Sequence, residues 1–395
     1  MRKTVICRVA NIFALAALAA IAIPQQAAAA SDFNFFTAVA KIASNDVWAV
    51  GGRASASTYL GDGLTEHWNG TSWAEVPNAA PGSSFYGFKG VAVASANDVW
   101  TVGFSQASST SAALPLIEHW NGAHWSIVAS PHVSSGELLA VTALSSNNVW
   151  AVGFLGNGNV GTQNLIEHWN GSAWQVVSSP ASGTLSILSS VSGSSANDVW
   201  AVGWATGYRQ RVAYQLSEHW NGSAWTAVGD PTFPVERYQS AVLAFSPTNA
   251  WAASANDVYA PKITSGFSTW NGSAWKLAPT TSNGYDDFHG LSATSPSDIW
   301  TVGDTFMAGG TTIFTLAAHW DGTKWTTFST PNPGTGGTST NGYGNYNTLA
   351  GVSVIATNDA WAVGTYNVYD SSGDLTKYTL AVHWDGTSWT VVPTT

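Results

Sequence analysis

Tryptophan recurs along this chain at a regular interval. A short segment of the type Val-Trp-Ala-Val-Gly returns in steps of 49 to 61 residues, and its tryptophans are Trp48, Trp100, Trp150, Trp200, Trp251, Trp300 and Trp361. A second motif, His-Trp-Asn-Gly-x-x-Trp or a close variant, follows each segment, and its two tryptophans are always five residues apart. The two motifs use 21 of the 22 tryptophans and leave only Trp204 outside them. The chain therefore consists of seven copies of one unit.

Each copy is predicted to form four antiparallel strands. In the second copy, alternating or β-rich runs occupy residues 90–94, 99–103, 116–120 and 125–128. Ser-Ala-Asn-Asp separates the first two runs, and we expect its Asn and Asp to form a tight turn that tolerates left-handed backbone. Asn-Gly begins the turn between the last two runs, and it is the strongest short hairpin signal. The fold class predicted for each copy is therefore all-β.

A ring is the arrangement that best buries such sheets. A four-stranded sheet that is apolar on both faces needs a neighbour on each side, and packing around an axis supplies both. The sequence thus predicts a seven-bladed β-propeller of four-stranded antiparallel blades, with tryptophans between the blades. An open solenoid is disfavoured because it repeats faster and needs distinct caps. Residues 36–43 and 389–392 read as a first and a fourth strand, so we expect closure by packing, without an exchanged strand.

The pattern resembles that of tectonin-type propellers and, more loosely, that of seven-bladed bacterial lectin propellers. The resemblance covers residues 33–395 and rests on the Val-Trp-Ala-Val and Trp-Asn-Gly-x-x-Trp motifs. The repeat is longer than a tectonin repeat. The Gly-His and Trp-Asp signatures of WD repeats are missing, and the double glycine of kelch repeats occurs only at Gly51-Gly52. The resemblance implies a propeller fold and does not choose a ligand.

The N-terminus predicts export. Residues 1–30 combine a basic start, an apolar run over 12–23 and small residues at 27–30, which together are typical of a secretory signal peptide. The propeller is then expected to span 31–395, in a secreted, extracellular or cell-surface protein. Cys7, the only cysteine, lies in the leader, so the mature chain should contain no thiol. No other segment approaches 18 apolar residues, and we expect no membrane span.

The charge balance excludes one class of partner. The chain has 13 basic and 23 acidic residues, and three basic residues belong to the leader, which leaves 10 against 23, or −13. A chain this acidic is a poor ligand for phosphate backbones, so no nucleic acid is expected. We expect a monomer whose partner is a glycan or a surface protein.

Catalytic motifs are scarce. The Glu-His-Trp triplet recurs around the ring, so its copies cannot converge on one substrate, and we interpret its histidines as structural. There is no Gly-x-Ser-x-Gly elbow, no His-Glu-x-x-His and no phosphate loop, and we assign no catalytic residue. The compact acid/base group Asp286, Asp287 and His289 lies just before the expected first strand of the sixth copy. It is expected at the mouth of the central channel and is the candidate for an enzyme.

The segments that differ between copies are the candidates for binding. The two short turns hardly vary and should lie on one face, whereas the variable connections should lie on the other. Tyrosine and arginine gather in these connections, where they either contact a ligand or pack and solvate the loops. The arginines near the fourth copy have the geometry for a carboxylate or a sugar acid. The candidate ligand-binding residues are Tyr208, Arg209, Arg211, Tyr214, Arg237, Tyr238, Asp286, Asp287 and His289.

The sequence leaves three functions open. The favoured one is a non-enzymatic, secreted module that binds carbohydrate or cell-wall glycan through the variable face, because sugar rings stack on aromatic side chains. The others are an extracellular protein-interaction scaffold and a polysaccharide hydrolase or lyase acting in the channel. No cofactor is expected. Asp370 and Asp374 have a spacing that calcium ligands can use, but an unliganded turn is the favoured interpretation.

Overall fold

The computed structural model describes residues 32–55, 61–82, 85–108, 110–156, 163–180, 185–206, 213–229, 237–256, 265–280, 286–306, 312–334, 346–369 and 375–395. Every element named in these ranges is a β-strand. The strands follow one another in consecutive sets of four, and each set corresponds to one sequence copy, here called a unit.

The first strand of each unit is ten to twelve residues long, and the second strand is eight to eleven residues long. The first strands are β1 (Asp32–Ala43), β5 (Phe85–Ser95), β9 (Gly136–Ser145), β13 (Leu185–Ser195), β17 (Arg237–Ser246), β21 (Asp286–Ser295) and β25 (Asn347–Ala356). The second strands are β2 (Asp46–Ser55), β6 (Asp98–Gln106), β10 (Asn148–Leu155), β14 (Asp198–Thr206), β18 (Asn249–Asn256), β22 (Asp298–Phe306) and β26 (Asp359–Tyr369).

The third strands are five to ten residues long, and the fourth strands have only three or four residues. The third strands are β3 (Gly63–Trp68), β7 (Leu114–Trp120), β11 (Gln163–Trp169), β15 (Ala213–Trp220), β19 (Gly266–Trp270), β23 (Ile313–Trp320) and β27 (Leu375–Trp384). The fourth strands are β4 (Trp73–Glu75), β8 (Trp125–Ile127), β12 (Trp174–Val176), β16 (Trp225–Ala227), β20 (Trp275–Ala278), β24 (Trp325–Phe328) and β28 (Trp389–Val391). The predicted strands are confirmed, but the first two extend further toward the variable connections than the sequence indicated.

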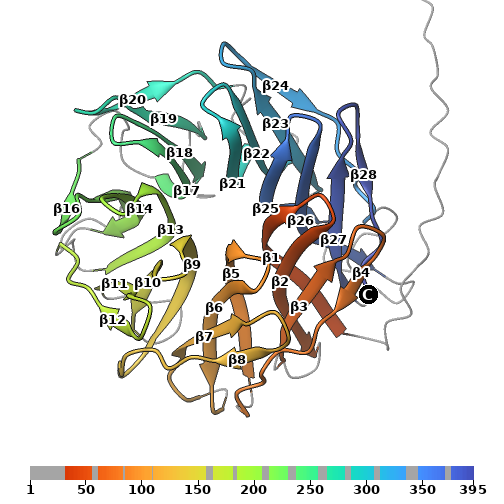
Figure 1. Cartoon of the computed structure of the whole chain (residues 1–395). Helices are drawn as coiled ribbons and strands as arrows, with labels where there is room; N and C mark the ends of the chain where they lie inside the picture. The colour runs from red at the N-terminus through yellow and green to blue at the C-terminus, as the bar shows by residue number, and fades with distance from the viewer. Residues whose placement is uncertain are drawn as a thin grey trace, which may run out of the picture.

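The sheets are antiparallel meanders arranged in a ring. Five of the six sheets contain four strands each, and the sixth contains eight, because β1–β4 and β25–β28 are joined. Figure 1 shows the sheets around a central opening, with the first strand of each unit innermost and the short fourth strands at the rim. The red β1–β4 unit lies beside the blue β25–β28 unit, so the two ends of the described chain meet.

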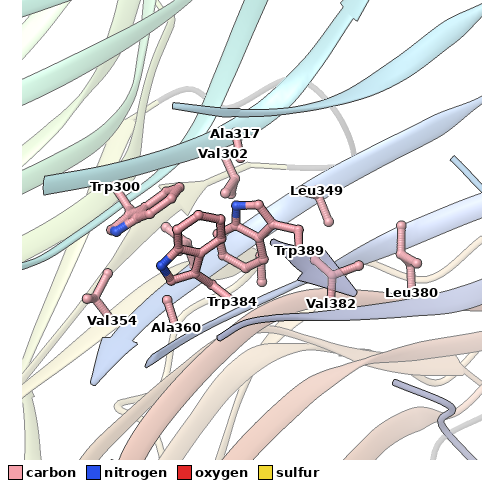
Figure 2. Close-up of a cluster of buried hydrophobic side chains, with 12 residues drawn as sticks. Trp300, Val302, Ala317, Leu349, Val354, Ala360, Leu380, Val382, Trp384 and Trp389 are labelled. Carbon is pink, nitrogen blue, oxygen red and sulfur yellow. The ribbon is translucent and has the colours of Figure 1, made fainter. Parts of the chain in front are cut away.

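Tryptophans fill the layers between neighbouring units. Trp300 of β22 lies 5.0 Å from Trp384 and 5.2 Å from Trp389 of the next unit, measured between ring centroids, and Figure 2 shows these three rings together with Val302 and Leu349. The second contact is edge-to-face at 85°, which places the positive edge of one ring on the negative face of another. The predicted role of the tryptophans is confirmed.

The joint between the first and last units uses the same packing. Trp361 lies 4.9 Å from Trp68 and 5.2 Å from Trp73. One additional parallel pair, Phe33 with Lys377, links β1 to β27. Closure by packing is therefore as expected, and this single pair is an addition that the sequence did not indicate.

The histidines of the repeated triplet are structural, as interpreted. His119 Nε2 lies 2.8 Å from Asp98 Oδ1 within its own unit, and the imidazole packs on Trp100 with ring centroids 4.2 Å apart. The turn prediction needs one correction. Asn97 and Asp98 do not adopt left-handed backbone, because the aspartate is already extended in β6 and uses its carboxylate to hold the histidine.

The glutamates of the same triplet join consecutive units. Glu118 is fully buried, and its Oε2 accepts a hydrogen bond from the backbone N–H of Ala79, at the exit of the preceding unit. Glu167 and Glu218 accept from the hydroxyls of Ser130 and Ser179 in the same way. At the joint of the ring, Glu66 accepts from the N–H of Thr395. Burial raises the pKa of all four glutamates to about 7.

Candidate functional site

The central opening contains a cavity of about 250 Å³. Its walls come from β1, β5, β9, β13, β17, β21 and β25, the innermost strand of every unit. A β-bulge in each of these strands inserts one residue that has no partner on the second strand. The inserted residues all line the cavity, and they are Thr37, Lys89, Leu139, Ser189, Ser240, His289 and Ala350.

The bulge position differs in chemistry from unit to unit. Three of its residues carry hydroxyls that bond the next innermost strand: Thr37 donates to the carbonyl of Phe88 at 2.9 Å, and Ser189 donates to that of Gln239 at 2.6 Å. Ser240 donates likewise to the carbonyl of Phe288. These hydroxyls stabilise the ring. Lys89 and His289 carry no hydroxyl and contact other partners.

His289 is held by a carboxylate that the sequence analysis missed. Its Nε2 lies 2.9 Å from Oδ2 of Asp304, which also accepts a hydrogen bond of 2.7 Å from the Thr348 hydroxyl. Burial lowers the pKa of His289, but the hydrogen bond and charge of Asp304, with the charge of Asp287, outweigh it, so the pKa lies above its ordinary value. An imidazole oriented by a buried carboxylate is able to transfer a proton.

The compact group predicted from the sequence is only partly brought together. Asp287 lies opposite Asp304 in the β21–β22 register, whereas Asp286 lies opposite Thr305 and its side chain points to the other face of the sheet. Burial and the charge of Asp304 raise the pKa of nearby Tyr346 to about 12.

A comparison of the seven copies contained a signal for Asp304. The position four residues after the second-strand tryptophan is acidic only there, and in the other copies it holds Gly52, Phe104, Phe154, Trp204, Ala255 and Thr365.

Lys89 is the second basic residue on the cavity. Its Nζ lies 5.4 Å from the ring centroid of Phe104, in a cation–π contact. Burial raises the pKa of Glu137 on the neighbouring strand, and the charge of Lys89 partly offsets that shift. Lys89 thus has charged and aromatic neighbours at the variable end of the channel.

An aromatic pair lies between the fourth and fifth units. Trp204, the tryptophan outside the repeat, packs edge-to-face on Tyr238 with ring centroids 5.3 Å apart. Both side chains are partly exposed. Gln215 lies opposite Trp204 on β15, and both atoms of its amide are buried without a hydrogen-bond partner in the described structure. Tyr214 is 37% exposed but lies opposite Ala205, so it points to the other face of the sheet.

Several predicted residues lie outside the described part of the chain. These are Tyr208, Arg209 and Arg211, the side chain of Arg237, and the two candidate calcium ligands Asp370 and Asp374. Among the residues that are described, no three histidines, cysteines or acids come close enough together to hold a metal ion. The same part of the chain contains no helix with the length and hydropathy needed to cross a membrane.

Comparisons with known proteins bear on the fold. No family model matches the chain, and no curated protein matches it. Among solved structures, YCF48 from Cyanidioschyzon merolae is similar at 15% identity with a TM-score of 0.50, over 83% of this chain and 92% of that one. The GH74 xyloglucanase from Xanthomonas campestris is similar at 11% identity and TM-score 0.52, over 89% of this chain and 58% of that one. Both are β-propeller proteins, and this chain is a β-propeller as well.

Proposed function

We propose that this protein is a secreted, seven-bladed β-propeller that binds carbohydrate without catalysis, through the end of the ring that carries the variable connections. The blade number follows from treating the eight-stranded sheet as two units, since a single residue pair joins β1 to β27. In this proposal residues 1–30 are a signal peptide, the repeat is of tectonin style, and the protein is a monomer.

The observation that carries the proposal is the Trp204–Tyr238 pair. Every other tryptophan repeats and packs between units, so the fold needs those rings at those positions. Trp204 does not repeat and stays partly exposed at the variable end. Sugar rings present apolar faces that stack on such surfaces. Tyr208, Arg209, Arg211 and Arg237 belong to the connections that flank it.

A protein-interaction scaffold is the second candidate, and a different surface favours it. The outer strands expose Ile127, Val176 and Leu277, which occupy the same position in three units. Exposed edge strands with apolar side chains are sites where another chain adds. A partner chain would therefore meet the rim of the ring.

Sedimentation with insoluble polysaccharides tests the carbohydrate proposal. We expect the purified protein to bind at least one cell-wall polysaccharide. Trp204→Ala should weaken this binding about tenfold or more. Trp204→Phe should retain most of it, because phenylalanine still offers an aromatic ring for stacking. Leu277→Ser, which alters an exposed rim residue, is the matched control and should bind as the unaltered protein does.

Two outcomes would count against it. If no polysaccharide or glycan-array sugar retains the protein, carbohydrate binding is removed. If Leu277→Ser abolishes capture of a partner chain while Trp204→Ala binds sugars normally, the scaffold replaces it. Repeating the assay in EDTA tests calcium at Asp370 and Asp374, and under this proposal the chelator has no effect.

A further inference from the structure

The cavity is lined by charge of one sign. Among the described residues that line it, Lys89 and His289 are the charged side chains, and both are basic. The carboxylates closest to them, Glu137 and Asp304, are not part of the cavity wall. The charged side chains that a ligand in the cavity would contact are therefore cationic, whereas Glu137 and Asp304 lie outside the cavity wall.

Two serines add hydrogen-bond donors to this wall. Ser190 Oγ accepts a hydrogen bond of 3.1 Å from the N–H of Val242, and Ser192 Oγ accepts one of the same length from Ala244. In each bond the serine uses a lone pair, so its own hydroxyl hydrogen remains to be donated. Both serines line the cavity.

The two basic residues come from strands on opposite sides of the ring. Lys89 lies on β5 and His289 on β21, with β9, β13 and β17 between them on one side and β25 and β1 on the other. Figure 1 shows β5 and β21 on opposite sides of the opening. Both occupy bulge positions, and both line the cavity.

We propose that the central cavity binds one small carboxylate, with the Lys89 ammonium and the His289 imidazolium as its cationic contacts. A volume of about 250 Å³ is just below the range of about 300–1,000 Å³ typical of ligand pockets, which suits an acid no larger than one sugar ring. Charged donors give the strongest hydrogen bonds to carboxylate oxygens. This site is separate from the Trp204–Tyr238 pair and does not depend on the carbohydrate proposal.

Binding should weaken as the pH rises. The groups that act on His289 are Asp304 on β22 and Asp287 on its own strand, and the same two acids act on Tyr346 just before β25. The two acids hold the imidazole protonated to a higher pH than usual, and the buried tyrosine stays neutral. Loss of the imidazolium proton removes one of the two cationic contacts, whereas Lys89 stays charged.

Isothermal titration calorimetry with glucuronate and glucose tests the site, because the two sugars share a ring and differ in the carboxylate. At pH 5.5 we expect saturable binding of glucuronate at one site per chain and none of glucose. At pH 8.5 the affinity should fall about tenfold. Lys89→Met and His289→Gln should each reduce the affinity at pH 5.5 about tenfold. The pH dependence should disappear in His289→Gln.

Lys377→Met is the matched control, since it also removes one positive charge but lies at the joint between β1 and β27, over Phe33. It should bind glucuronate normally. Equal affinity in Lys89→Met, His289→Gln and Lys377→Met would overturn the proposal, as would binding of inorganic phosphate without glucuronate. Circular dichroism establishes that each variant is folded. Failure of polysaccharide sedimentation would leave this result intact, because the ligand and readout differ.

Discussion

At the residue scale, one repeat position takes different roles in different units. The bulge holds a hydroxyl where it bonds the next innermost strand, as Thr37 does, and a base where it contacts a carboxylate of its own unit and lines the cavity, as His289 does. The histidine directly before the third-strand tryptophan shows a smaller variation. Five of these histidines lie against an aspartate, whereas His168 lies against Asn148, 2.9 Å away.

We predict that Asn148→Asp raises the pKa of His168 by about one unit. Burial lowers the pKa of His168 at present, and a carboxylate in place of the amide would stabilise the imidazolium. An NMR pH titration of the ring measures the change. Asn147→Asp adds the same charge in the exposed turn and should shift the pKa far less. An equal shift in both variants would show that the 2.9 Å contact is not its cause.

At the element scale, the Asn-Gly hairpin differs in detail from a two-residue turn. Trp68 pairs with Trp73 across a four-residue loop, and Asn69 Oδ1 accepts hydrogen bonds from the N–H groups of Thr71 and Ser72, both at 3.0 Å. The glycine that follows has a φ of +94°, and a Cβ there would lie 2.7 Å from the Cβ of Asn45 in the β1–β2 turn. The two turns, which hardly vary between copies, therefore touch, and this contact limits the residues that either turn can hold.

We predict that Gly70→Ala destabilises the protein by about 1–3 kcal/mol, because it combines a strained φ with this steric contact. Urea unfolding measures the free energy. Gly229→Ala is the control: its φ is not left-handed and a Cβ would meet nothing within 4 Å, so the change should be close to neutral. If the two variants had the same free energy of unfolding, neither the φ of Gly70 nor the contact between the turns would contribute to stability.

At the scale of the whole molecule, four buried glutamates tie consecutive units together around the ring. Within the described structure, one carboxylate oxygen of Glu66, Glu118 and Glu167 is buried without a partner, which favours the protonated form. Between the ordinary pKa of 4.5 and about 7, the folded state retains protons that the unfolded chain releases. The ring therefore loses stability as the pH rises through this window.

We predict a lower free energy of unfolding at pH 8 than at pH 5, measured by urea denaturation. His289 acts in the same direction and His168 in the opposite one. Glu218→Gln should be more stable than the unaltered protein at pH 8, by at most about 3 kcal/mol, and close to it at pH 5. Asp62→Asn, at an exposed position, should leave the profile between pH 5 and pH 8 unchanged. A flat profile would contradict the assignment.

The sequence predicted the fold better than the site because the two depend on different distances along the chain. Strand and turn positions come from alternation and from Asn-Gly within one copy, so the 21 repeating tryptophans marked them. The Glu118–Ala79 and Asp304–Thr348 bonds join residues 39 and 44 positions apart. No local pattern specifies such pairs. His289 was identified as a channel residue, but its partner Asp304 was not.

The sequence alone determined that seven similar four-stranded units exist, where their turns fall and which rings pack between them, because those features arise from residues close together in the chain. Only the tertiary structure decided which variable residues meet. A bulge interrupts the two-residue alternation of each inner strand, so it turns Lys89 and His289 toward a shared cavity that no count of alternating residues locates.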